Sequence, residues 1–158
     1  MSYNDRNQRS NRNSDQRSNR NSDIDSIVSE ISKVKMLKDL KAKDYADEGG
    51  YADKIAKHFS GRNNELKTNQ LRKLFGALRD IESKEGNWEE IEPQFYLLKP
   101  KLAYDAGRSL IPKDFYKLMM NILRKVDSGN VEDKNQNFKT LINFLEAIVS
   151  YRKFYGDK

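Results

Sequence analysis

The stretch Phe138-Lys-Thr-Leu141-Ile142-Asn-Phe144-Leu145-Glu-Ala-Ile148-Val149 decides the fold of this chain. Its apolar residues recur every three or four positions and occupy nearly every side of a helix. A helix that is apolar almost all round has to be covered by other elements on most of its surface. We therefore expect residues 135–155 to form a helix at the centre of a bundle.

The segments N-terminal to this helix show the same periodicity. The expected first helix is capped by Asp23, and its apolar residues are Ile24, Ile27, Val28, Ile31, Val34, Leu37 and Leu40. Gly49-Gly50 then breaks the chain. The short helix that follows stops at Gly61, and its apolar residues are Tyr51, Ile55, Ala56 and Phe59.

Helical periodicity continues through the middle of the chain. A helix that Thr68 can cap has its apolar stripe at Leu71, Leu74, Phe75, Leu78 and Ile81. The next helix starts at Asn87, with Trp88, Ile91, Phe95, Leu98 and Leu102. Pro100 predicts a kink or a break there, because proline lacks a backbone donor and crowds the preceding turn. Pro112 suits the start of a helix with Phe115, Leu118, Met119, Ile122 and Val126.

A loop at Ser128-Gly129-Asn130 precedes the central helix, and no stretch shows sustained alternation of period two. The fold class we expect is all-α: a single compact bundle of five or six helices over residues 24–158. Residues 1–23 contain the tandem repeat Arg-Ser-Asn-Arg-Asn-Ser-Asp and almost no apolar residue. We expect a disordered, low-complexity tail there, because nothing in it offsets the entropy of ordering.

Composition narrows the functional classes. The chain has no cysteine, which excludes disulfides and thiolate metal sites. No apolar run approaches the roughly 20 residues of a membrane span, and the polar N-terminus lacks the apolar centre of a signal peptide. We expect a cytoplasmic protein without a membrane partner, cofactor or metal.

Charge is unevenly distributed along the chain, whose net charge is +6. Residues 99–125 hold seven Lys or Arg against two Asp, whereas residues 80–92 hold six acids against one Lys. The positive excess serves either solubility or the binding of a polyanion. Separated charge favours a polyanion on one surface and a basic partner, such as a second copy of the chain, on another.

Catalysis has little support in the sequence. The single histidine, His58, lies near the end of a short helix, where a surface or capping role is expected. The acids are scattered, and no nucleophile elbow or phosphate-binding glycine loop is present. Asp127-Ser-Gly-Asn resembles part of a calcium loop but lacks its length and closing glutamate, so we expect a turn.

Basic residues on helix edges support polyanion binding better. Arg72 and Arg79 lie two turns apart on one edge with Gly76 between them, where a phosphate strand can approach. The alternative is that both pair with acids such as Glu82. The other candidates for RNA binding are Lys67, Lys73, Lys99, Lys101, Arg108 and Lys125. Tyr104 either stacks on a base or packs in the core, and we expect core packing.

Four blocks in the sequence resemble one known family. They are Gln70-Leu-Arg72-Lys73-Leu-Phe75, the run from Phe95 through Lys99-Pro100-Lys101 to Gly107-Arg108, and the pair Asn137-Phe138-Lys139 and Phe144-Leu-Glu146-Ala-Ile-Val149. Their order and approximate spacing, over about residues 30–155, resemble the small subunit of the type III-A CRISPR effector, the Csm complex.

The resemblance implies a non-catalytic subunit that stacks head to tail in several copies. Its implied partners are guide RNA, target RNA, the other subunits of the complex and copies of itself. The residues that stand inside matching blocks, and so carry the implied RNA contact, are Arg72, Lys73, Lys99, Lys101 and Arg108. Two alternatives remain open: a helical adaptor without nucleic-acid binding, and a nuclease that uses the carboxylates around Glu89 to Glu92.

Overall fold

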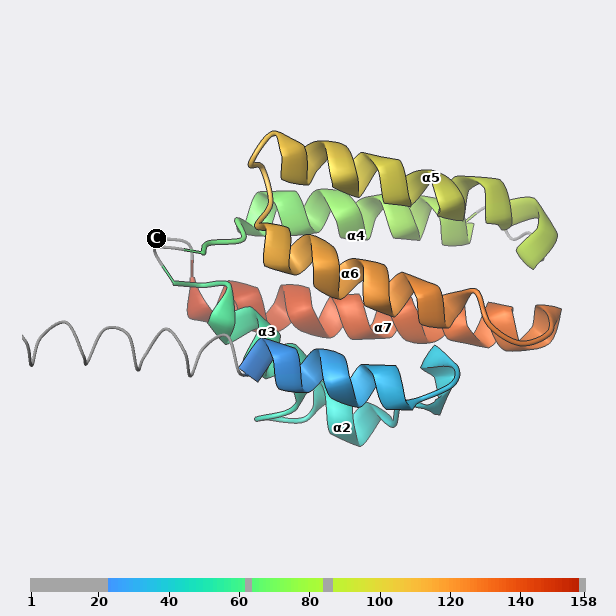
Figure 1. The fold of residues 1–158 in the computed structure, drawn as a ribbon, viewed down its shortest axis with the longest axis horizontal. Coiled ribbons are helices and arrows are strands. Elements are labelled where there is room, and N and C mark those ends of the chain that lie inside the picture. The colour runs from blue at the N-terminus through green and yellow to red at the C-terminus, as the bar shows by residue number, and fades with distance from the viewer. Residues whose placement is uncertain (1–22, 62–63, 84–86, 157–158) are drawn as a thin grey trace, which may run out of the picture.

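The computed structural model describes residues 23–61, 64–83 and 87–156, and within these ranges the chain is helical with no strand (Figure 1). The elements in order are a helix over 23–33, η1 (Leu37–Asp39), α2 (Ala42–Ala46), α3 (Tyr51–His58), α4 (Thr68–Ser83), α5 (Trp88–Gly107), α6 (Lys113–Val126) and α7 (Val131–Tyr155). The all-α expectation is confirmed. The expected tail lies, apart from Asp23, outside the described residues, and the domain division at residue 24 stays a prediction.

The C-terminal helix α7 is central, as its apolar stretch predicts. It contacts η1, α2, α3, α4, α5 and α6, and in Figure 1 it lies between the α4–α5 pair and the N-terminal elements. Phe144 meets Tyr45 edge to face at 5.3 Å, and Phe138 meets Phe95 at 6.4 Å. Because α7 is covered on several sides at once, apolar residues are needed nearly all round it.

α7 begins at Val131, four residues earlier than the sequence predicts. Asn130 and Asp133 form a reciprocal capping box, in which each side chain accepts a hydrogen bond from the other's backbone N–H, at 2.8 and 3.0 Å. This satisfies donors that the first helical turn leaves without partners. The cap therefore extends the helix into a polar segment that hydrophobic periodicity does not mark.

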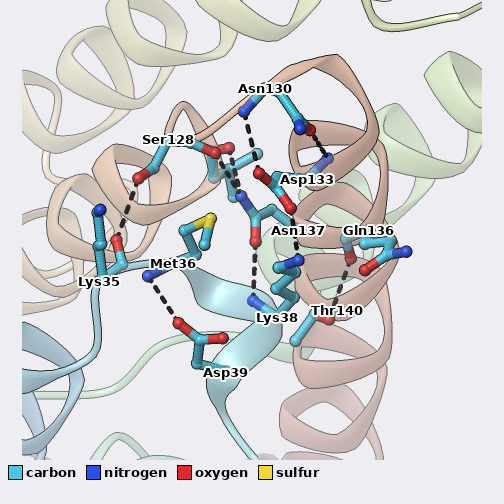
Figure 2. Close-up of polar contacts among 11 residues, drawn as sticks. Lys35, Met36, Lys38, Asp39, Ser128, Asn130, Asp133, Gln136, Asn137 and Thr140 are labelled. Carbon is cyan, nitrogen blue, oxygen red and sulfur yellow. Dashed lines mark hydrogen bonds and ion pairs between the residues drawn. The ribbon is translucent and has the colours of Figure 1, made fainter.

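The expected first helix is shorter than its apolar spacing indicates. It ends at residue 33, and the chain then bends into η1. The bend brings Lys38 N–H to the buried Asn137 side-chain oxygen at 2.8 Å, while Ser128 Oγ donates to the Lys35 carbonyl at 3.1 Å (Figure 2). Leu37 and Leu40 are still buried, so the periodicity identifies the core residues but not the helix end.

Pro100 does not break α5, so the possibility of a break there is wrong. The helix runs without interruption through Pro93 and Pro100. Both prolines are exposed, as is Tyr96, whose carbonyl is the one that would bond to the donor Pro100 lacks. On the outer face of α5, water can satisfy that carbonyl, which removes much of the cost of an internal proline.

Candidate nucleic-acid interface

α4 and α5 run antiparallel and side by side on one flank of the bundle (Figure 1). A pocket of about 200 Å³ lies where they approach the start of α6. Its apolar lining comes from Leu74, Leu98, Leu102, Leu110, Ile111 and Phe115, and its polar lining from Gln70, Lys73, Lys101 and Asp105. Two sequence-predicted cations from different helices, Lys73 and Lys101, thus line the same pocket.

The charge at this pocket is available to a ligand. Lys73 and Lys101 are both exposed, and in the described part of the chain neither forms an ion pair. Asp105 is half-buried and offsets one of the two positive charges. The pocket therefore combines a largely apolar lining with a net positive charge. It suits an anionic ligand that also presents some apolar surface.

Arg108 and Lys67 lie at the same end of the α4–α5 pair, because α4 begins where the antiparallel α5 finishes. Both are exposed. Arg108 is the C-terminal cap of α5, and its guanidinium donates to the Tyr104 hydroxyl at 2.8 Å. Lys101, Asp105 and Arg108 recur at spacings of four and three residues, so they share one side of the helix. The cations Lys67, Lys73, Lys101 and Arg108, here called the groove cations, therefore gather at one end of this pair.

Arg72 and Arg79 share an edge of α4, as their spacing predicts, but it is not the edge that carries Lys73. Arg79 pairs with Glu82 at 2.9 Å and lies over the Phe75 ring at 5.3 Å, whereas Arg72 is exposed and forms no ion pair with any described residue. The acid-pairing alternative thus holds for Arg79 alone. A side chain added at Gly76 would meet no atom within 4 Å, so the surface beside these arginines is open.

Lys99 lies on another side of α5 from Lys101. It is half-buried, with its ammonium 5.2 Å from the centroid of the Tyr96 ring. The Tyr96 hydroxyl donates to Asp127, which raises the pKa of Tyr96 to about 12 and lowers the pKa of Asp127 below its usual value. Lys134, at 3.1 Å, and Lys99 also help to lower the Asp127 pKa. These contacts join α5 to the α6–α7 turn.

Lys125 has an internal contact in the structure. It is half-buried, and its ammonium donates to the Ser32 carbonyl at 3.1 Å. Ser32 is in the last turn of the helix over 23–33, where carbonyls lack partners within the helix and a positive charge is favourable. The eight predicted residues are therefore not one patch. The structure collects the groove cations and places Lys99, Lys125 and the two α4 arginines elsewhere.

The expectation that Tyr104 packs in the core is wrong, since its side chain is 59% exposed. The apolar stripe of α5 itself indicates this, because Tyr104 falls on the opposite side from Leu98 and Leu102 at 3.6 residues per turn. Sequence analysis also missed Gln70 and Asp105 as pocket residues. No signal in the sequence marks them, since their role depends on how α4 and α5 pack.

The other sequence features have structural roles. His58 ends α3, where its Nε2 lies 3.1 Å from the Asn64 side-chain nitrogen and its ring packs edge to face on Phe59. Asp127-Ser-Gly-Asn forms the turn between α6 and α7, as expected. In the ranges that the structure covers, no three His, Cys, Asp or Glu side chains are placed to hold a metal ion. None of the helices there has the length and apolar character needed to cross a bilayer.

Fold and site together define a small all-α bundle protein with a cationic groove between two antiparallel helices. The family model described as Csm2 Type III-A matches residues 42–158. This match spans more than half of the chain, so the chain belongs to the Csm2 family, the small subunits of type III-A CRISPR complexes.

A curated relative supports the same assignment. It is the "CRISPR system Cms protein Csm2" of Streptococcus thermophilus, which is 29% identical over 121 residues; the match covers 75% of this chain and 97% of that protein. No solved structure gives a significant match. The family region includes α2 through α7, and therefore both helices of the cationic groove.

Proposed function

We propose that this chain is a non-catalytic, RNA-binding subunit of a cytoplasmic type III-A CRISPR effector complex. In this proposal it contacts guide–target RNA through the groove cations, with Arg72 and Arg79 on the neighbouring edge of α4. The observation that carries the proposal is the convergence of Lys73 and Lys101 on one pocket without ion pairs to described residues. Family membership supplies the RNA-guided setting in which such a groove has a ligand.

The chemistry of the groove favours contacts to the RNA backbone. Lysine and arginine ends on helix surfaces reach phosphate and ribose oxygens, which carry no sequence information by themselves. Each phosphate neutralised by a cation releases counterions, so affinity falls as salt concentration rises. We therefore expect binding that tolerates any sequence and depends strongly on salt.

Removing both pocket lysines tests this proposal. In the variant Lys73→Ala/Lys101→Ala we expect weaker binding to single-stranded RNA and a shallower dependence of log K on log salt. The slope changes by about 0.7 for each lost phosphate contact, hence about 1.4 for the pair. Fluorescence anisotropy over a salt series measures both quantities, with the full chain and within the assembled complex.

The matched control is Lys41→Ala/Lys43→Ala, which removes the same charge from exposed positions at α2, on the other flank of the bundle (Figure 1). It separates a local effect from the loss of net charge. Equal weakening by the two variants would show that only net charge matters. Unchanged RNA binding by the α4–α5 variant would contradict the proposal and favour a helical adaptor.

We further propose that copies stack head to tail through complementary charge. The described acids of this part of the chain lie at the end of the α4–α5 pair opposite Lys67 and Arg108, because the two helices are antiparallel; they are Asp80, Glu82, Glu89, Glu90 and Glu92. Glu89 and Glu90 are exposed in the first turn of α5. A surface that is acidic at one end and basic at the other can join copies heterologously, in an open array and not a closed dimer.

Charge reversal at the acidic end tests the stacking. With Glu89→Lys/Glu90→Lys we expect fewer copies of this subunit per complex, measured by native mass spectrometry, because like charges then face each other. The control Glu48→Lys/Glu146→Lys makes the same change of charge at exposed positions outside α4 and α5. If the copy number is the same in both variants and the natural chain, charge does not drive the stacking.

A further inference from the structure

The exposed tyrosine on α5 carries an aromatic ring, and phosphate binding alone gives that ring no role. Tyr104 lies on the outer face of the helix with most of its ring in contact with solvent. The Arg108 guanidinium carbon is 5.6 Å from the ring centroid, and the same side chain donates to the Tyr104 hydroxyl. The exposed ring offers a flat apolar face to a partner, since burying apolar surface is favourable.

We propose that Tyr104 is a stacking platform for an unpaired nucleobase of the RNA strand bound by the groove cations. This inference rests on the proposed RNA binding and adds to it a site for the base itself. Aromatic faces stack any of the four bases, and an adjacent arginine adds a cation–π contribution. Unpaired bases in single-stranded regions are the part of RNA that proteins recognise in this way.

The local geometry supports a prepared platform. Tyr104 and Arg108 are four residues apart in the last turn of α5, so their side chains lie one above the other. The backbone N–H of Arg108 bonds to the Tyr104 carbonyl at 3.0 Å, which completes this turn. The side-chain hydrogen bond holds the ring in one orientation. A ring held in advance loses less conformational entropy when a base stacks on it.

The cations around Tyr104 are placed for the nucleotide that carries the base. Lys101 precedes Tyr104 by three residues, hence by about 5 Å along the helix axis. Lys101 also lines the pocket with Lys73, so positive charge runs from the tyrosine into the groove. A strand with one base on Tyr104 would therefore place its neighbouring phosphates near flexible ammonium groups.

A protein partner is the competing occupant, because Leu97 is 65% exposed two turns before Tyr104. The cations favour RNA over this alternative. Lys101 lies three residues before Tyr104, and lysine is depleted at protein interfaces, whereas Arg108 suits either partner. The experiment below includes the outcome that the face binds protein.

The experiment replaces the ring with an apolar side chain that has no flat face. In Tyr104→Leu we expect about tenfold weaker binding of single-stranded oligouridylate, which corresponds to the loss of one stacked base. The slope against salt stays unchanged, because no charge is lost. Binding to a blunt duplex stays within twofold, since its bases are already stacked on each other. Anisotropy titrations with the full chain measure all three quantities.

Two matched variants control the result. Tyr104→Phe keeps the ring but loses the hydroxyl that accepts from Arg108, so it is expected to bind oligouridylate slightly more weakly than the natural chain and much more tightly than Tyr104→Leu. Phe154→Leu removes an aromatic ring that is 80% exposed on α7, outside the pocket lining, and is expected to change nothing. The platform is overturned if Tyr104→Leu binds oligouridylate like the natural chain, or if duplex binding falls equally.

The outcomes separate this inference from the proposed function. If Lys73→Ala/Lys101→Ala weakens binding but Tyr104→Leu does not, the groove stands and the platform fails. If the natural chain binds neither RNA even at low salt, both fail. If Tyr104→Leu leaves RNA binding intact but lowers self-association or recovery of the other subunits in native mass spectrometry, the α5 face docks protein and the platform is again overturned.

Discussion

The substitution Arg152→Met is expected to lower the free energy of unfolding by about 3–5 kcal/mol, the usual cost of breaking a buried charge pair from one side. Arg152 is fully buried in α7. It donates to the Leu66 carbonyl at 2.8 Å and to the Gly156 carbonyl at 2.6 Å, and it pairs with Glu65 at 3.4 Å. Methionine fills much of the same volume but leaves these acceptors without their donor.

Urea denaturation measures this loss, with Trp88 as the reporter. Trp88 is the only tryptophan and is buried against Phe95, so its emission changes on unfolding. The matched control is Lys153→Met, which removes a neighbouring charge that is exposed. We expect it to change the free energy of unfolding by no more than about 0.5 kcal/mol. Equal unfolding midpoints for the two variants would show that Arg152 is not a structural clamp.

The clamp connects the core to the proposed interface. At Gly156, Arg152 satisfies a backbone carbonyl at the C-terminal end of α7. The contact with Leu66 is the more consequential, because Leu66 directly precedes Lys67 and the start of α4. The position of the α4 N-terminus, and with it Lys67, therefore depends on a residue 86 positions away in the sequence.

Asn137→Ala is expected to cost about 3 kcal/mol of folding free energy, because three backbone groups lose their partner. The fully buried Asn137 side chain accepts from Lys38 N–H at 2.8 Å and donates to the carbonyls of Val126 and Ser128, each at 3.0 Å. One side chain thus joins η1, the end of α6 and α7 (Figure 2). The same urea titration measures the loss.

The control for Asn137 is Gln136→Ala, an exposed neighbour on the same helix whose side chain makes none of these contacts. We expect it to leave stability nearly unchanged. A cost for Asn137→Ala no larger than that of the control would mean that water replaces the lost bonds without penalty. Because a domain of this size is stabilised by about 5–15 kcal/mol, the two buried substitutions together are expected to leave it marginally folded.

Near Asn137, the Lys38–Asp133 pair adds a charged contact at 2.5 Å. The hydrogen bond from Lys38 is the main reason that the pKa of Asp133 lies below its usual value, and the same bond raises the pKa of Lys38. Both shifts favour the charged forms in the folded chain. The Lys38–Asp133 pair therefore stabilises the folded chain at neutral pH, and this stabilisation is lost as acid protonates Asp133.

Much of the fold follows from local chemistry. Gly49-Gly50 breaks the chain before α3, Asn87 caps α5 by accepting from Glu90 N–H, and Pro112 precedes α6, each as predicted. The family blocks also identify the chain correctly. What the apolar spacing misses is the bend after residue 33 and the short α2, because these are formed by contacts with α7 and its preceding turn.

The candidate site shows the same division. The sequence by itself determined that Lys73 lies on a helix, because a period of 3.6 residues and cap residues act within a few positions of the chain. Only the tertiary structure decided that Lys73 and Lys101 line one pocket while Lys125 binds the Ser32 carbonyl. The reason is physical: a helix fixes the direction of a side chain relative to its own axis, and only the packing of helices fixes which side chains meet.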